Sequence, residues 1–137
     1  MSHGKYRRLK KGGIAMDFVE AVQSVFSNFL NFRGRARRSE FWYFFLFVFV
    51  VSFILGVIQI LIWGQDANYL TGIFSLIILI PNIAVSIRRL HDTGRSGFWY
   101  LIGFIPIIGT IILIIWYCQD SEPGDNKYGP NPKEYLR

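Results

Sequence analysis

The chain has 137 residues, of which 52% are apolar, 18% are aromatic and only 18% are charged, and its net charge is +6. A soluble domain usually carries about 25% charged residues, so this composition excludes an ordinary soluble globule and a disordered chain. One cysteine excludes an internal disulfide framework and a cysteine-cluster zinc site.

Residues 1–15 carry most of the excess positive charge. Five Lys and Arg residues and no acidic residue precede Met16, whereas the rest of the chain holds ten basic and nine acidic residues. We interpret this segment as an expression remnant before a natural start at Met16, with a basic arm on a membrane surface as the alternative. Because no folded platform accompanies these charges, nucleic-acid binding is not expected.

Residues 17–32 have the spacing of an amphipathic helix. Apolar side chains such as Phe18, Val22, Val25 and Phe29 recur at helical intervals, and polar side chains occupy the other face. We expect this helix to lie along the membrane surface or to pack on the end of the helix bundle, and the two placements are compatible.

Three long uncharged apolar runs follow, over residues 41–63, 69–87 and 98–118. A helix needs roughly 20 such residues to cross about 30 Å of hydrocarbon. The sequence therefore predicts an all-α membrane protein with three transmembrane helices in one integral domain over residues 16–137. A re-entrant third segment that turns at residues 106–109 is the alternative. We favour a full span, because arms of about 10 residues are too short to cross.

Tryptophans mark the ends of these runs, and a few polar side chains interrupt them. Trp42, Trp63, Trp99 and Trp116 are expected to be interfacial anchors, because an amphipathic ring is most stable at the headgroup level. Gln59 and Asn82 are the candidate intramembrane polar residues. Asn82 follows Pro81, and we expect its amide to hydrogen-bond across helices with the carbonyl that the proline frees.

The loop over residues 88–97 carries three arginines, a histidine and an aspartate. If the preceding helix continues through it, Arg88 and Asp92 are one turn apart and can form an ion pair. His91 and Asp92 do not predict a catalytic dyad, because neighbouring residues on a helix point in different directions and no positioned nucleophile accompanies them. The loop predicts either a site for a phosphate-bearing headgroup or a basic anchor on the cytoplasmic side.

Loop charge predicts the orientation. A cytoplasmic N-terminus places seven basic residues inside and three outside, the latter in an irregular tail over residues 119–137. With three full spans the C-terminus is then periplasmic. With a re-entrant third segment the tail returns to the cytoplasm, where its acidic residues can pair with the arginines.

Residues 31–42, 81–97 and 123–129 resemble the small bacterial inner-membrane proteins of the family named domain of unknown function 805. The run Arg-Arg-Leu-His-Asp at residues 88–92 is the most specific part of a resemblance that covers about residues 16–133. It implies a bacterial inner-membrane protein with several spans, and it implies no agreed activity.

Two functions from different classes follow. The first is a non-enzymatic membrane module that binds anionic lipid headgroups or a membrane partner through a cytoplasmic arginine surface. The second is a subunit of a transport or efflux assembly, as a homo-oligomer or with a partner protein, in which Gln59 and Asn82 line a shared path. No catalytic residue, metal ligand or cofactor is predicted. The candidate residues of the binding surface are Arg33, Arg35, Arg37, Arg38, Arg88, Arg89, His91, Asp92 and Arg95.

Overall fold

The computed structural model describes residues 7–8, 16–133 and 135–136. In chain order these form β1 (Arg7–Arg8), α1 (Phe18–Ser27), α2 (Arg38–Trp63), α3 (Tyr69–Asp92), the 3-10 helix η2 (Gly97–Phe104), α4 (Ile108–Cys118) and β2 (Tyr135–Leu136). The two short strands pair antiparallel. Apart from Arg7–Arg8, the leader predicted over residues 1–15 lies outside the described residues.

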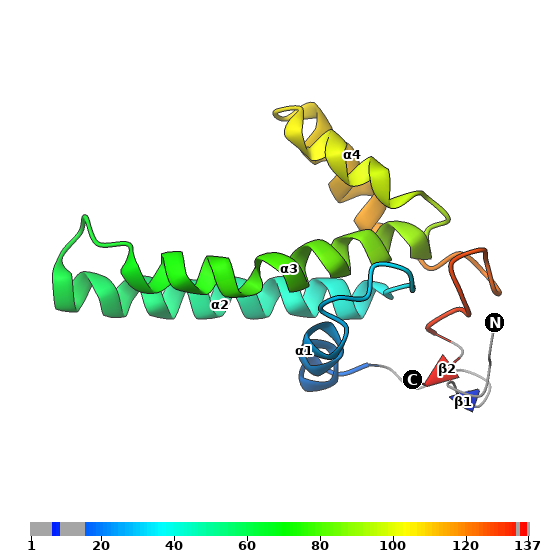
Figure 1. Ribbon diagram of the computed structural model, residues 1–137, viewed down its shortest axis with the longest axis horizontal. Helices are drawn as coiled ribbons and strands as arrows, with labels where there is room; N and C mark the ends of the chain where they lie inside the picture. The colour runs from blue at the N-terminus through cyan, green and yellow to red at the C-terminus, as the bar shows by residue number, and fades with distance from the viewer. Residues whose placement is uncertain (1–6, 9–15, 134, 137) are drawn as a thin grey trace.

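The helices α2 and α3 form a long hairpin that dominates the structure (Figure 1). Both are long and apolar enough to cross a membrane. With 26 and 24 residues, they measure ~39 Å and ~36 Å at 1.5 Å per residue. The predictions of helices over residues 41–63 and 69–87 are confirmed, and both helices extend further at the end that carries the arginines. Phe53, Leu61 and Leu76 are exposed along them, and such an apolar surface is typical of a protein that contacts lipid.

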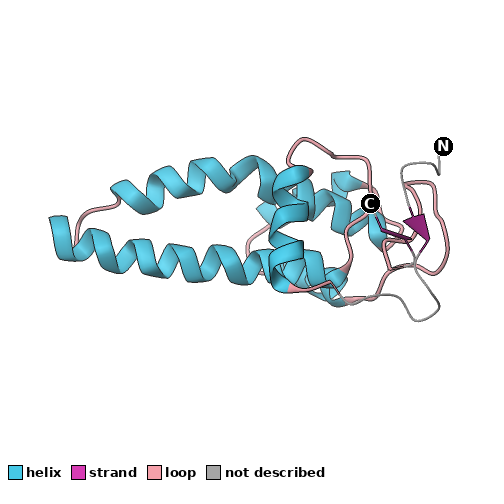
Figure 2. Cartoon of the chain, turned by 90° about the horizontal axis from the view of Figure 1, so that it is seen from below, coloured by secondary structure: helices cyan, strands magenta, loops and turns pink. Residues whose placement is uncertain are grey.

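The short helix α1 lies across this hairpin near one end, as Figure 2 shows from below. Asp17 begins it, because its carboxylate accepts a hydrogen bond from the backbone N–H of Glu20 at 2.7 Å. Val25 is buried, and the ring of Phe26 packs edge-on against Phe44 of α2. The helix ends at Ser27, five residues before the predicted boundary at residue 32, and its placement on the hairpin matches the bundle-end alternative.

The third apolar run is not one helix, so the prediction of a transmembrane helix over residues 98–118 is wrong. η2 and α4 are two short arms that fold back on each other around a turn. Pro106 has no N–H to continue a helix, and Ile107 adopts a φ of 68°. The arms approach so closely that a Cβ at Gly109 would overlap the carbonyl oxygen of Ile102.

The two tryptophans of this run show the consequence most clearly. As ends of one helix, Trp99 and Trp116 would lie ~26 Å apart. Their ring centroids are instead 5.7 Å apart in an edge-to-face contact. The arms hold 8 and 11 residues, so each is ~16 Å long. That is about half of a hydrocarbon layer of roughly 30 Å, and the pair projects from the α2–α3 hairpin (Figure 1). This fold-back matches the alternative of a segment that turns at residues 106–109.

Candidate functional site

The start of α2, the end of α3 and the end of α4 meet at one end of the hairpin. We call this end the cap, and we include in it the loop over residues 28–37 and the tail over residues 119–133. The opposite end, at residues 64–68, is called the tip. The cap contains the fully buried side chains Arg35, Arg88 and Arg89 together with the buried carboxylates Glu40 and Asp92. We call these five residues the arginine cluster.

Asp92 is the centre of the arginine cluster. Its Oδ1 accepts from Nε of Arg35 at 3.0 Å, and its Oδ2 accepts from Nη1 of Arg89 at 2.7 Å. The Ser121 hydroxyl from the tail donates to the same Oδ2 at 2.6 Å. Burying charges is costly, and the mutual attraction offsets this cost only when such hydrogen bonds are complete. Asp92 therefore links the loop before α2, the end of α3 and the tail.

Arg88 pairs with a different carboxylate. Its Nη1 donates to Oε2 of Glu40 at 2.6 Å, and both side chains are buried. The predicted pair of Arg88 with Asp92 is wrong, because the Arg88 guanidinium is directed to Glu40 of α2 and Arg89 pairs with the aspartate instead. Arg88 and Glu40 tie the end of α3 to the start of α2.

The same guanidinium groups also bind backbone carbonyls that a helix end leaves without partners. Arg89 donates to the carbonyl oxygens of Tyr117, at 3.2 Å, and Gln119 at the end of α4. Arg35 donates to the carbonyl oxygen of Glu122 at 2.6 Å. Cationic groups are favourable at helix C-termini, where the carbonyl dipoles point outward.

These contacts place the tail beside the loop that precedes α2. The prediction of a periplasmic C-terminus depended on three full spans, whereas the tail lies at the same end of the hairpin as residues 33–38. The physical reason is that η2 and α4 fold back on each other and return the chain to the end from which it came.

His91 belongs to the same junction and not to a catalytic pair. Its ring stacks on Tyr128 with centroids 3.9 Å apart and an angle of 3° between the planes. Its Nδ1 lies 3.1 Å from the carbonyl oxygen of Gly34, a position in which the nitrogen donates. The Asp92 carboxylate faces arginines and Ser121 instead. Within the described residues, no group of three or more His, Cys, Asp and Glu could hold a metal ion.

The other basic residues of the cap face outward to different extents. Arg33 and Arg38 are exposed, and Arg37 and Arg95 are half-buried. Arg38 lies 3.6 Å from Asp120 of the tail. Lys133 donates to the same carboxylate at 3.0 Å and is the main reason why the pKa of Asp120 lies below its ordinary value of 3.8. The candidate arginines thus divide into a buried set and an outward set, and contact of either set with lipid stays a prediction.

The two intramembrane amides have different environments. Gln59 is buried and accepts from the backbone N–H groups of Leu70 and Thr71 at 3.1 and 3.2 Å, so it caps the start of α3. Asn82 is exposed on α3, and its side chain makes no hydrogen bond with any residue that the structure describes. The expected bond from Asn82 across helices is therefore not formed among the residues that the structure describes.

The four tryptophans lie at the two ends of the hairpin. Trp42, Trp99 and Trp116 lie at the cap or on the re-entrant arms, and Trp42 donates to the carbonyl oxygen of Tyr117 at 3.2 Å. Trp63 lies at the tip, 5.4 Å from the ring of Tyr69. That the four tryptophans anchor the protein at membrane interfaces stays a prediction. Trp116 does not lie at the opposite end of the third run from Trp99, because the two rings are in contact.

The sequence interpretation missed three residues of the cap, namely Glu40, Ser121 and Tyr128. Glu40 did carry a signal, because it is the one acidic residue between Glu20 and Asp66 and lies directly after the arginines. Ser121 and Tyr128 carried none, since their roles depend on the return of the tail.

Comparison with known proteins places this architecture in a family. Residues 29–130 match the family described as "Protein of unknown function (DUF805)". The chain is 44% identical to Inner membrane protein YhaH of Escherichia coli K12 over 112 residues, 80% of this chain and 93% of the relative. It is 46% identical to Inner membrane protein YhaI of the same organism over 110 residues, 80% of this chain and 92% of the relative. No solved structure matches.

Proposed function

The chain belongs to the DUF805 family, and we propose that it is a multi-pass inner-membrane protein whose cap binds anionic lipid headgroups without catalysing a reaction. The inner-membrane location is supported by the names of its relatives YhaH and YhaI. It is supported independently by the two helices α2 and α3, which are long and apolar enough to cross a bilayer.

The distribution of basic residues carries the proposal. Nine Lys and Arg residues lie between residues 16 and 133, and all nine are in the cap or in the turn before η2. Residues 64–68 at the tip include no Lys or Arg. Positive loops stay on the cytoplasmic side. We therefore orient the cap toward the cytoplasm, with both the loop before α2 and the tail on that side and the tip on the periplasmic side.

Within this orientation the arginines have two tasks. The buried side chains of Arg35, Arg88 and Arg89 hold the cap together through carboxylates and carbonyls. The outward residues Arg33 and Arg38 lie where the headgroups of the cytoplasmic leaflet begin. Each Lys or Arg near an anionic surface contributes about 1 kcal/mol of attraction at physiological salt. A membrane partner with an acidic surface is the alternative occupant.

The test compares the affinity of the reconstituted protein for phosphatidylglycerol and for phosphatidylcholine, by quenching of tryptophan fluorescence with brominated lipids. We expect a preference for phosphatidylglycerol that weakens with added salt and with the double substitution Arg33→Gln and Arg38→Gln. Asp66→Asn at the tip is the matched control and should leave the preference unchanged. Equal affinity for the two lipids at low salt would remove the proposal.

A second candidate function, a subunit of a transport assembly, has one observation in its favour. The Asn82 amide is exposed in the apolar part of α3, where it lines a cavity with residues of α2, η2 and α4, and interhelical hydrogen bonds of such groups in membranes contribute about 1–2 kcal/mol. Gln59 does not support a shared path, because its carbonyl is occupied by the start of α3. This candidate requires an oligomer in lipid that Asn82→Leu weakens. A strictly monomeric protein with no co-purifying partner would exclude it.

A further inference from the structure

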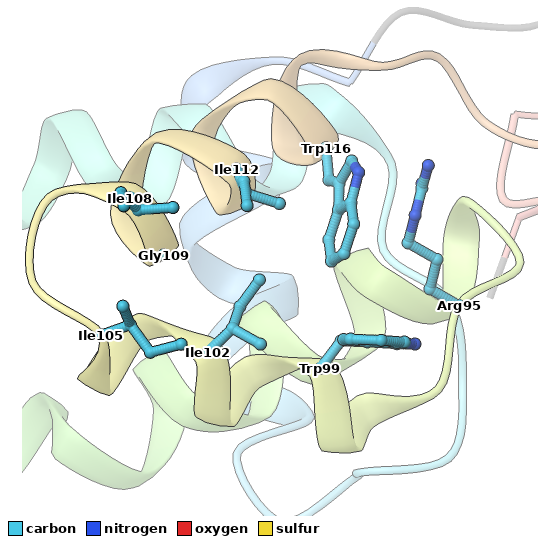
Figure 3. A pocket seen from close by; sticks show the side chains of 8 residues that line it. All are labelled: Arg95, Trp99, Ile102, Ile105, Ile108, Gly109, Ile112 and Trp116. Carbon is cyan, nitrogen blue, oxygen red and sulfur yellow. The ribbon is translucent and has the colours of Figure 1, made fainter.

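The two arms, η2 and α4, enclose an apolar slot. Its volume is about 340 Å³, near the lower limit of ligand pockets in proteins. Figure 3 shows isoleucines of the two arms facing each other across the slot, with the turn at one end and Trp99, Trp116 and Arg95 at the other. The isoleucines are Ile102, Ile105, Ile108 and Ile112.

Arg95 is held at the mouth of this slot. Its Nη1 donates to Oε1 of Gln119 at 2.8 Å, and its guanidinium carbon lies 4.5 Å from the centre of the Trp116 ring. A guanidinium carries five N–H donors, and this is the one hydrogen bond that the Arg95 side chain makes with the described residues. The group is therefore fixed in orientation and keeps donors for a phosphate, which a guanidinium binds in a two-pronged geometry.

The depth of the slot identifies what fills it. The arms are ~16 Å long, so in the proposed orientation the slot extends from the headgroup level, where arginine and tryptophan are favourable, into the hydrocarbon. Its walls are apolar along this length and positive at the mouth. An anionic phospholipid has the complementary arrangement of a phosphate joined to an apolar chain. The volume fits part of one chain and excludes a whole lipid or a helix of a partner protein.

We propose that the slot between η2 and α4 is a specific site for an anionic phospholipid, with one acyl chain between the arms and its phosphate on Arg95. This inference rests on the proposed function, because it assigns a defined site to the lipid binding proposed for the cap. It adds that this site involves the re-entrant arms and not only the exposed arginines.

The experiment uses the full chain with Trp42→Phe and Trp63→Phe, so that fluorescence comes from Trp99 and Trp116. The protein is reconstituted in phosphatidylcholine and titrated with phosphatidylglycerol brominated on its acyl chains. We expect strong quenching with a midpoint that Arg95→Gln raises roughly tenfold, since a charge-assisted hydrogen bond is lost. Ile112→Phe, which fills the slot and keeps the arginine, should also raise the midpoint. Asp66→Asn at the tip, at the opposite end of the hairpin from the slot, is the control and should not.

The outcomes separate the two proposals. If Arg95→Gln and Ile112→Phe behave like Asp66→Asn while the preference for phosphatidylglycerol persists, the slot proposal is overturned and the general lipid binding stands. If the parent protein is quenched equally by brominated phosphatidylglycerol and phosphatidylcholine, both proposals fail. Circular dichroism of each variant shows whether its helices are retained, and Ile112→Phe provides the test if Arg95→Gln does not fold.

Discussion

Asp92→Asn is the substitution that most directly tests the role of the arginine cluster. The Asp92 side chain is completely buried and accepts hydrogen bonds from Arg35, Arg89 and Ser121 at 2.6–3.0 Å. The amide is neutral and leaves two buried guanidinium groups without their shared carboxylate. Removing one partner of a buried ion pair costs about 3–5 kcal/mol, which shifts the equilibrium between docked and released tail by roughly two to three and a half orders of magnitude.

The assay is limited trypsin digestion in detergent micelles, because Lys127 lies in the exposed part of the tail. Cleavage follows the population of the open form when opening and closing are fast, so Asp92→Asn should accelerate cleavage after Lys127 strongly. Asp120→Asn is the matched control. It removes a carboxylate that is about half exposed, at 53%, and pairs of this kind contribute roughly 0–1 kcal/mol. Equal cleavage rates for Asp92→Asn and the unchanged protein would refute the claim that the cluster holds the tail.

Three further predictions concern the arms, the tip and the tail. Gly109→Ala should destabilise the re-entrant arms by about 1–3 kcal/mol, because its Cβ meets the carbonyl oxygen of Ile102, and denaturant unfolding followed by tryptophan fluorescence measures this loss. Gln59→Leu should lower the unfolding free energy by about 1–3 kcal/mol, because two buried N–H groups lose their acceptor; unchanged stability would contradict the capping role. Because the pKa of Asp120 is lowered by Lys133, the pair stabilises the fold above pH 3.8 and loses this effect as the carboxylate is protonated at lower pH. The stability difference between the unchanged protein and Asp120→Asn should therefore disappear in acid, and a difference that grows in acid would contradict the sign.

The two long helices could be predicted from the sequence because the signal is local. An uncharged run of about 20 apolar residues is long enough to cross a bilayer as a helix, and the first two such runs form helices at the expected places. The third run has the same length and composition, yet it folds back at Ile107. Composition does not distinguish the two outcomes, because the turn depends on Pro106 and on the close approach of two backbones at Gly109.

The arginine cluster shows a second limit. The sequence predicted that the residues of the loop before α2 and of the α3 end belong to one charged surface. It did not predict which of them form ion pairs with one another. Arg35 and Asp92 are separated by 57 residues, and Arg88 and Glu40 by 48. Local spacing favoured the pair of Arg88 with Asp92, which does not form. The near balance of ten basic and nine acidic residues after residue 15 was the available sign that many of these arginines have internal partners.

The central claim is that the third apolar run re-enters the membrane and returns the tail to the side of the arginines. Labelling of single cysteines with an impermeant maleimide tests it, using Lys127→Cys and Asp66→Cys separately in a chain with Cys118→Ser. Both positions are exposed, one in the tail and one at the tip. We predict that Lys127→Cys is labelled only from the cytoplasmic side and Asp66→Cys only from the periplasmic side. Labelling of both positions from the periplasmic side would mean that the third run crosses the membrane, and the account would be wrong.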